Sequence, residues 1–297
     1  MNIEIIANPN SGRGRGTERA QRIAELCSTR GHEVGIHFSR SRQDVSDWAE
    51  QSAKTAERLV IVGGDGTVNA AVDGFKSTPP PIAISPLGTA NVLAHVLKIS
   101  KRPADTVTLL ERGVTQMIDA PTVNLQRDDE TVTQRAFLCI GFGFDGEIIR
   151  IMDEHRNGPI HMAQYIKPLG LALKNWKPSP QMVIADGKEI GEFAYGIVSG
   201  VNIYGSPILR LGNSALDDQL WELFLFKDIN LLSGGLFALA AASGQLRKHP
   251  HVTHLSAKHV IIKGNEPAPV QIDGDFAGYS PVELDFDKSQ IPVLITT

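Results

Sequence analysis

The sequence predicts a doubly wound α/β domain followed by a second domain that is mostly β. Its length of 297 residues is enough for two ordinary domains, and 42% hydrophobic residues are enough to bury a core. Apolar runs typical of buried strands alternate with helical patterns up to about residue 120. Beyond Asp119, most segments have the pattern of short strands and are separated by turn dipeptides.

The first domain starts with a strand that leads through a glycine-rich turn into a helix. Ala20, Ile23 and Cys27 recur at helical spacing, which gives that helix one buried face. Residues 58–62 form a short, continuous apolar run, as expected in a parallel sheet that is covered on both faces. The expected order is strand 3–8, helix 17–30, strand 33–38, helix 43–55, strand 58–62, a helix from residue 68, strand 82–85 and helix 90–97.

The second domain is expected to contain many strands and only two helical segments. The helical segments are 147–174, interrupted near Gly158-Pro159, and 231–247. A last strand at 292–296 is expected to return to the first domain. The predicted boundaries are 1–120 for the α/β domain, 121–287 for the β domain and 288–297 for the returning segment. The expected strands are 121–125, 136–140, 181–184, 189–198, 220–226, 259–263, 270–272 and 282–286.

Charge and cysteine content exclude several classes of protein. The net charge is −4 without a basic block, so we expect no nucleic-acid partner. Two cysteines, Cys27 and Cys139, are too few for a disulfide scaffold or a four-thiolate zinc site. The N-terminus lacks an export-signal pattern, and the most apolar later segment, 231–243, is shorter than the roughly 20 residues that span a bilayer. We therefore expect a cytoplasmic protein.

The strongest chemical signal is the GGDGT string at residues 63–67, which lies between a strand and a helix. Its glycines let the backbone approach a phosphate group and direct N–H groups at it, and the following helix N-terminus favours the same anion. Asp65 has no proton to donate to a phosphate, but it can orient a magnesium ion or accept a proton from an attacking hydroxyl. The alternative is a tight turn in which Asp65 only caps the helix.

Two further loops are expected at the same edge of the sheet. Residues 8–16 follow the first strand, and residues 86–91 follow the strand at 82–85. Ligands of open α/β sheets bind beyond the carboxyl ends of the strands, so the three loops together suggest a nucleotide-sized polyanion. Arg13 and Arg15 supply positive charge. The sequence contains no Walker A motif, and a solvated connector is the alternative for the first loop.

Four ordered motifs make the sequence resemble the diacylglycerol kinase catalytic-domain family, which includes bacterial lipid kinases, sphingosine kinases and ceramide kinases. The motifs are NPNSG at 8–12, GGDGTVN at 63–69, PLGTAN at 86–91 and IDGD at 272–275. They cover nearly the whole chain, whereas GGDGT alone is shared with NAD kinases and phosphofructokinases. The resemblance implies an N-terminal nucleotide-binding domain, a C-terminal β-sandwich, and a cleft between them in which MgATP phosphorylates a lipid hydroxyl.

The resemblance also implies roles for particular residues. Asp65 and Asp273 are expected to be catalytic, Asp65, Asp119 and Asp275 to act on magnesium, and Asp145 to contact the lipid substrate. The alternatives are a hairpin turn for Asp273, a strand-end cap for Asp119 and a structural turn for Asp145. The residues expected to hold the nucleotide are Asn8, Asn10, Ser11, Arg13, Gly63, Gly64, Gly66, Thr67, Gly88, Thr89 and Asn91.

The sequence departs from the family pattern at three positions. Val92 stands where many bacterial relatives have an aspartate, Asp275 replaces the usual glutamate, and Gln219 replaces the glycine of a turn that holds magnesium in some members. A GxGxxG string at 141–146 is not followed by the acidic residue that a dinucleotide site needs, because 164–180 contains no Asp or Glu.

The predicted function is therefore an ATP-dependent lipid kinase that phosphorylates a hydroxyl of a diacylglycerol-like or sphingoid-like lipid. We expect ATP and Mg²⁺ as cofactors and peripheral contact with the membrane surface. The oligomeric state is open, and a homodimer is compatible with the sequence. The alternatives are a soluble-substrate kinase of the NAD kinase type and a non-catalytic regulator that senses nucleotide or lipid.

Overall fold

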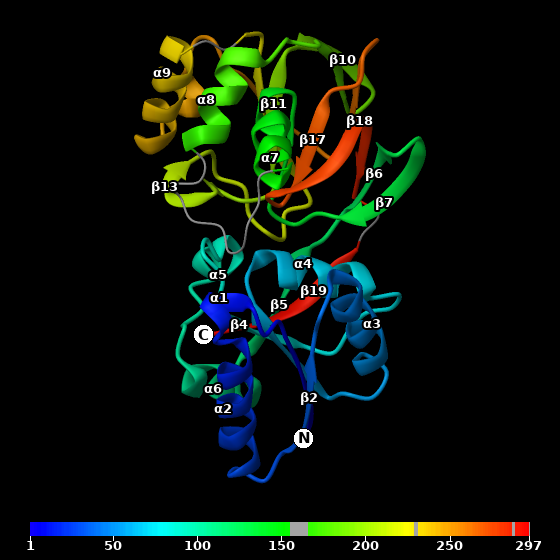
Figure 1. Cartoon of the computed structure of the whole chain (residues 1–297), viewed down its shortest axis with the longest axis vertical. Helices are drawn as coiled ribbons and strands as arrows, with labels where there is room; N and C mark the ends of the chain where they lie inside the picture. Colours follow the sequence, from blue (N-terminus) through cyan, green and yellow to red (C-terminus); the bar gives the residue numbers. More distant parts are fainter. Residues whose placement is uncertain (155–165, 229–230, 287–288, 297) are drawn as a thin grey trace. The chain divides into compact units, whose positions relative to one another are not determined.

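The computed structural model describes residues 1–154, 166–228, 231–286 and 289–296. The chain divides into two compact units (Figure 1). The first comprises Met1–Ala120 and Gln290–Thr297, and the second comprises Pro121–Ser289. The predicted break in a helix near Gly158-Pro159 lies outside the described residues.

The first unit is built on one sheet with the strand order β2-β1-β3-β4-β19-β5. Neighbouring strands are parallel except for β5, which runs antiparallel to β19. The central strands β3 and β4 are apolar over most of their length because helices cover both faces of the sheet. The strands are β1 (Asn2–Ala7), β2 (Glu33–Phe38), β3 (Arg58–Gly63), β4 (Ile82–Pro86), β5 (Val114–Asp119) and β19 (Gln290–Ile295).

The helices of the first unit follow from their apolar spacing and their caps. Ala20, Ile23 and Cys27 of α2 pack with α6 residues on β1 and β3. On the other side, α3 and α4 contact each other and the same two strands (Figure 1). The Ser41 side chain caps α3 by accepting a hydrogen bond from the Asp44 N–H. The helices are α1 (Ser11–Gly14), α2 (Gly16–Ser28), α3 (Arg42–Ser52), α4 (Asp65–Gly74), α5 (Val92–Val96) and α6 (Pro103–Arg112).

The second unit is an antiparallel β structure, as the sequence predicts. The main sheet follows the path β10-β9-β16-β18-β17-β8-β11-β14-β15, with β6 paired to β18 and β7 to β6. The strands are β6 (Thr122–Arg127), β7 (Glu130–Arg135), β8 (Cys139–Phe142), β9 (Gln181–Ala185), β10 (Lys188–Phe193), β11 (Tyr195–Ser199), β12 (Ile203–Tyr204), β13 (Ser206–Arg210), β14 (Trp221–Phe226), β15 (Thr253–Ala257), β16 (His259–Lys263), β17 (Pro269–Ile272) and β18 (Asp275–Asp285).

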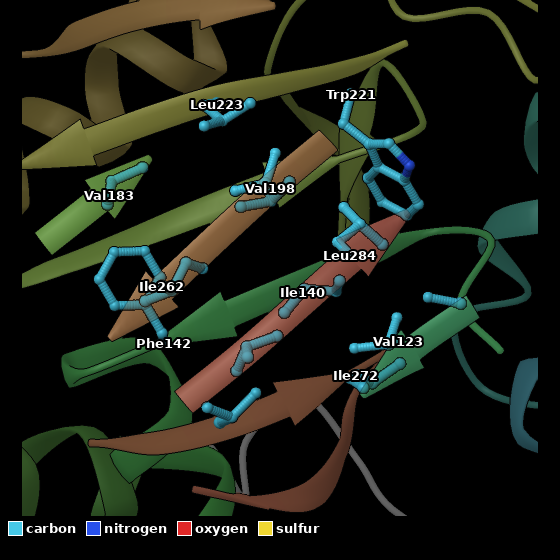
Figure 2. Close-up of a cluster of buried hydrophobic side chains, with 14 of the residues drawn as sticks. Val123, Ile140, Phe142, Val183, Val198, Trp221, Leu223, Ile262, Ile272 and Leu284 are labelled. Carbon is cyan, nitrogen blue, oxygen red and sulfur yellow. The ribbon is translucent and has the colours of Figure 1, made fainter. Parts of the chain in front are cut away.

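Strand β18 turns this sheet into a sandwich because it takes part in two sets of ladders. Its first half pairs with β17, its second half pairs with β16 and β6, and its register shifts between Tyr279 and Val282. Side chains from both sets of strands, such as Val198 and Ile262, meet in one buried core (Figure 2). The fold class predicted from the sequence is therefore confirmed for both units.

Three helices of the second unit pack on a separate apolar cluster. They are α7 (Phe144–Glu154), α8 (Ile166–Asn175) and α9 (Leu231–Ala242). Ala172 of α8 and Phe237 of α9 are buried in this cluster, together with Phe144. Among the residues that the structure describes, no helix has both the length and the hydropathy needed to cross a bilayer.

Candidate functional site

Three loops of the first unit pack against one another where β1, β3 and β4 end. The Leu87 N–H donates to the Gly63 carbonyl at 2.8 Å. A Cβ at Gly88 would lie 2.6 Å from the Cα of Gly64, so only glycine permits this approach of the two backbones. A Cβ at Gly12 would lie 2.5 Å from the Leu87 Cγ. The loops 8–16, 63–67 and 86–91 therefore lie together within this unit, as the sequence predicts.

The first of these loops is held by its own polar groups. The Asn8 Oδ1 accepts from the Asn10 N–H at 3.0 Å, which forms an Asx turn. The Arg15 Nε donates to the Gly12 carbonyl at 2.9 Å, so this guanidinium supports the turn. Asn10 and Arg13 are exposed at the tip of the loop. Arg13 therefore has an exposed charge on a loop of the candidate nucleotide site, whereas Asn8 builds the turn.

Asp65 is the first residue of α4, but its carboxylate caps a different helix. Its Oδ2 accepts from the Val92 N–H at 2.9 Å, and its Oδ1 accepts from the Leu93 N–H at 3.1 Å. These are the first two N–H groups of α5, which have no partner within that helix. Burial raises the pKa of the Asp65 carboxyl above its usual range, and the two backbone hydrogen bonds oppose that shift. Asp65 thus fixes the position of α5 relative to the glycine loop.

The loop at 86–91 is closed by one side chain. The Asn91 Oδ1 accepts from the Gly88 N–H and its Nδ2 donates to the Gly88 carbonyl, both at 2.7 Å. Asn91 is buried and has a left-handed backbone conformation with φ of 47°. Thr67 is buried beside Gly63. Thr89 is exposed at the tip of the loop. The exposed nucleotide-site candidates are therefore Asn10, Arg13, Gly66 and Thr89.

Of the predicted metal ligands, Asp65 and Asp119 lie in the first unit and Asp275 lies in the second. Asp119 is buried at the end of β5 and accepts a hydrogen bond at 2.8 Å from Gln290 on β19. Asp275 begins β18 in the other unit. Within the described ranges, no three His, Cys, Asp or Glu side chains lie together as a metal cluster. Mg²⁺ in phosphoryl-transfer sites is commonly held by one or two carboxylates plus the phosphates of the substrate.

Asp273 lies in the turn between β17 and β18 of the second unit, where its carboxylate accepts three backbone N–H groups. Its Oδ1 accepts from Leu138 at 2.8 Å and Cys139 at 3.0 Å, and its Oδ2 accepts from Phe137 at 3.1 Å. The side chain is buried and the residue has φ of 52°. The turn predicted as an alternative for Asp273 exists, and its carboxylate also orders the segment that leads into β8.

Asp145 lies at the start of α7 and is held by two neutral donors. The Tyr204 hydroxyl donates to its Oδ1, and the Gln271 Nε2 donates to its Oδ2 at 2.9 Å. Burial raises the pKa of the Asp145 carboxyl above its usual range, and both hydrogen bonds act in the opposite direction. Gly141 makes room for this arrangement, because a Cβ there would overlap the Asp145 Oδ2.

In the turn at 215–220, Gln219 stands where the family has a glycine, and the side chain of Asp218 closes the turn. The Asp218 Oδ2 accepts from the Ala215 N–H at 3.2 Å, and its Oδ1 accepts from the Leu220 N–H at 3.0 Å. Gln219 has the positive φ of 54° that glycine adopts more readily. The carboxylate therefore stabilises the turn itself.

Sequence reasoning missed Gln271 and Tyr204, which contact a predicted site residue. Gln271 is 126 positions from Asp145 in the sequence, and Tyr204 is 59 positions away. The available signal was the position of Gln271, two residues before the Asp273-Gly274 turn. Leu87 was also missed, although its packing against Gly12 joins two of the loops.

Comparisons with known proteins find matches over nearly the whole chain. Residues 2–123 match the family model described as diacylglycerol kinase catalytic domain. Residues 139–295 match the model described as YegS C-terminal NAD kinase beta sandwich-like domain. Diacylglycerol kinase of Bacillus subtilis is 25% identical over 94% of this chain and 91% of that protein. The Staphylococcus carnosus diacylglycerol kinase is 24% identical, covering 97% of this chain and 93% of that protein.

Solved structures share the fold. A putative diacylglycerol kinase from Bacillus anthracis has a TM-score of 0.76 at 18% identity, covering 100% of this chain and 97% of that one. Yeast NADH kinase complexed with NADH has a TM-score of 0.52 at 14% identity, covering 100% of this chain and 84% of that one. Together with the family models that match each unit, the four ordered motifs show that the chain belongs to the diacylglycerol kinase catalytic-domain family.

Proposed function

We propose that this chain is an ATP-dependent lipid kinase that phosphorylates a hydroxyl of a diacylglycerol-like or sphingoid-like lipid. The observation that carries the proposal is the packing of three glycine-rich loops at one edge of a parallel sheet, in a chain of the diacylglycerol kinase family. Such loops bring backbone N–H groups to a triphosphate, and in-line positioning is the main requirement of phosphoryl transfer.

In this proposal the loops 8–16, 63–67 and 86–91 hold ATP. Arg13 and Thr89 are exposed on two of these loops and are the side chains that we assign to the phosphates. Asp65 keeps its proposed catalytic role, and its hydrogen bonds to α5 add a second role in shaping the loops. In the second unit, Asp273 is the proposed proton acceptor and Asp145 the proposed contact of the lipid.

Two features of the second unit support contact with a membrane surface. Leu169 of α8 and Leu236 and Leu239 of α9 are exposed. Both helices pack on the same buried cluster through other residues. Lys167 and Lys174 are exposed on α8, and residues 231–265 contain no Asp or Glu. Leucines beside lysines are typical of proteins that bind anionic lipid surfaces.

The test is transfer of labelled γ-phosphate from ATP, with Mg²⁺, to a total lipid extract, followed by mass spectrometry of the labelled species. We expect the label in a phospholipid and its loss when a chelator removes the metal ion. Label in NADP⁺, with NAD⁺ present as a competing acceptor, supports a soluble-substrate kinase instead. Tight ATP binding without transfer to any acceptor supports a regulator. Both of the last two results contradict the proposal.

A further inference from the structure

A buried amide of the second unit joins the carboxylate of Asp145 to the turn that contains Asp273. Gln271 lies on β17 opposite Gly141 of β8, and its side chain is 1% exposed. Its Nε2 donates to the Asp145 Oδ2 at 2.9 Å. Its Oε1 accepts from the Gly274 N–H at 2.8 Å, and Gly274 directly follows Asp273. One side chain thus reaches both the Asp145 carboxylate and the Asp273 turn.

The orientation of this amide is fixed by its neighbours. The Asp145 carboxylate accepts hydrogen bonds, so it selects the nitrogen end of the amide, whereas the Gly274 N–H selects the oxygen end. The glycine opposite Gln271 leaves the space that the Asp145 carboxylate occupies. Tyr204 holds the other carboxylate oxygen. The Gln271 Nε2 also donates to the Cys139 Sγ at 3.6 Å. A rotated amide would lose the hydrogen bonds to both Asp145 and Gly274.

The Asp273 turn is also hydrogen-bonded to the beginning of the segment 137–145, which ends at Asp145. Its carboxylate binds the N–H groups of residues 137–139, and its own N–H donates to the Cys139 carbonyl at 2.8 Å. Residues 137–145 are thus braced at one end by Asp273 and at the other by Gln271. A movement of the turn changes both contacts at once, because Gly274 and Asp273 are adjacent.

We propose that Gln271 is a positioning residue that holds Asp145 and the Asp273 turn in one geometry, with Tyr204 as a second support for Asp145. The proposal rests on the proposed function in that both carboxylates then serve the lipid acceptor. Gln271 touches neither the lipid nor the nucleotide in this view. It acts by keeping the carboxylate of Asp145, the proposed contact of the lipid, at a fixed place relative to Asp273, the proposed proton acceptor.

The first test uses Gln271→Met, which nearly keeps the shape of the side chain but removes its hydrogen bonds to Asp145 and Gly274, and Tyr204→Phe, which removes one hydroxyl. We expect the KM for the lipid to rise about tenfold in each variant while the KM for ATP stays unchanged. Gln271→Glu places a second carboxylate against Asp145, so its activity at neutral pH should be lower than that of Gln271→Met.

The pH profile separates positioning from a general loss of stability. Both hydrogen bonds favour the ionised form of Asp145, so removing either one lets the protonated form persist to higher pH. The acid limb of kcat/KM should therefore move to higher pH in Gln271→Met and in Tyr204→Phe. The neighbouring phenol, Tyr195, is buried and its pKa is raised, so it stays neutral throughout this range.

Gln181→Met is the matched control. Gln181 is a fully buried glutamine of the same unit, donates to the Ser179 and Glu266 carbonyls at 2.9 Å, and accepts from the Ser280 hydroxyl at 2.7 Å. Its replacement also removes buried hydrogen bonds, but it should leave the acid limb and the lipid KM unchanged. A change in this control equal to that in Gln271→Met overturns the proposal.

Amide hydrogen exchange tests the proposal without an assay of enzymatic activity. In Gln271→Met, exchange should accelerate at Gly274 and at residues 137–139 together, and in Gln181→Met it should not. Unchanged exchange at 137–139 overturns the coupling even if the lipid KM rises. If the wild-type protein transfers phosphate to no lipid, the proposed function is contradicted. The exchange pattern still tests whether Gln271 couples Asp145 to the Asp273 turn.

Discussion

Two aspartates of the second unit share one local geometry, but a catalytic role is predicted only for Asp273. Asp273 and Asp186 each precede a glycine and have a positive φ, of 52° and 48°. Asp186 accepts from the N–H groups of Lys258 and His259 through its Oδ1. Asp273 accepts from three N–H groups of residues 137–139. A hydrogen-bonded Asp-Gly turn is therefore not by itself a mark of catalysis.

This pair gives a matched test of the proposed catalytic role. Asn tolerates a positive φ, so Asp273→Asn and Asp186→Asn remove the charge without straining the backbone. Asp273→Asn should lower the free energy of unfolding by about 1–3 kcal/mol in urea titrations, because one of the two buried oxygens that accept backbone N–H groups is lost. Asp186→Asn should change it little, because Asp186 is exposed and both of its hydrogen bonds go to one oxygen, which asparagine retains. Only Asp273→Asn should abolish phosphate transfer. Transfer at the wild-type rate by folded Asp273→Asn would reduce Asp273 to a structural turn.

At the scale of elements, the glycine loops depend on a backbone contact that side chains would prevent. A Cβ at Gly88 would meet the Gly64 Cα at 2.6 Å and the Asn91 Oδ1 at 2.9 Å. Gly88→Ala should therefore push the loops 63–67 and 86–91 apart. Displacements of about 1 Å at a reacting centre reduce turnover by about a hundredfold. We expect a loss of that size in turnover, with weaker ATP binding by titration calorimetry.

Gly170→Ala is the control for this substitution. Gly170 lies in α8, and a Cβ there meets no atom within 4 Å. Alanine in a helix is favoured over glycine by up to about 1 kcal/mol, so this variant should bind ATP normally and melt at an equal or higher temperature. If Gly88→Ala binds and turns over ATP as the wild type does, the contact between the loops has no role in the nucleotide site.

Many regular elements were predicted from their apolar pattern, but helix α6 and strands β5, β7 and β15 were missed. The strand expected at 58–62 is β3. Its apolar run has the length of a buried strand and is too short for an ordinary helix. The expected single strand at 189–198 is instead two strands, β10 and β11, which pair with different neighbours. The hairpin of β12 and β13 was also missed, since a strand of two residues such as β12 carries no periodicity.

At the scale of the whole molecule, the sequence indicated where the candidate sites lie but not how their side chains are held. Parallel strands bring their carboxyl ends to one edge, so the convergence of the loops follows from strand order. The partners of Asp65 are 27 and 28 residues away, and those of Asp273 are more than 130 away. No local pattern encodes such pairings, which arise from tertiary packing.

The proposed contact with a membrane depends on which side chains the folded surface exposes. Leu236 is 48% exposed and Leu239 is 67% exposed on α9, although leucine gains about 1.5–3 kcal/mol when fully buried. Lys167 and Lys174 on α8 add an attraction to anionic lipids, which the net charge of −4 does not supply. We therefore expect the protein to sediment with phosphatidylglycerol vesicles and to do so less at high salt.

Replacing both α9 leucines should weaken this binding while ATP binding stays intact. Leu236→Asn with Leu239→Asn should lower the partition coefficient by about tenfold or more, since each asparagine removes apolar surface from the contact. The control is Val114→Asn on β5, where an apolar side chain of similar exposure, 42%, lies in the other unit. Equal losses in both variants would mean that vesicles bind exposed apolar surface without preference. Binding to neutral phosphatidylcholine vesicles as strong as to phosphatidylglycerol would remove the role of the two lysines, and the leucines alone would then define the surface.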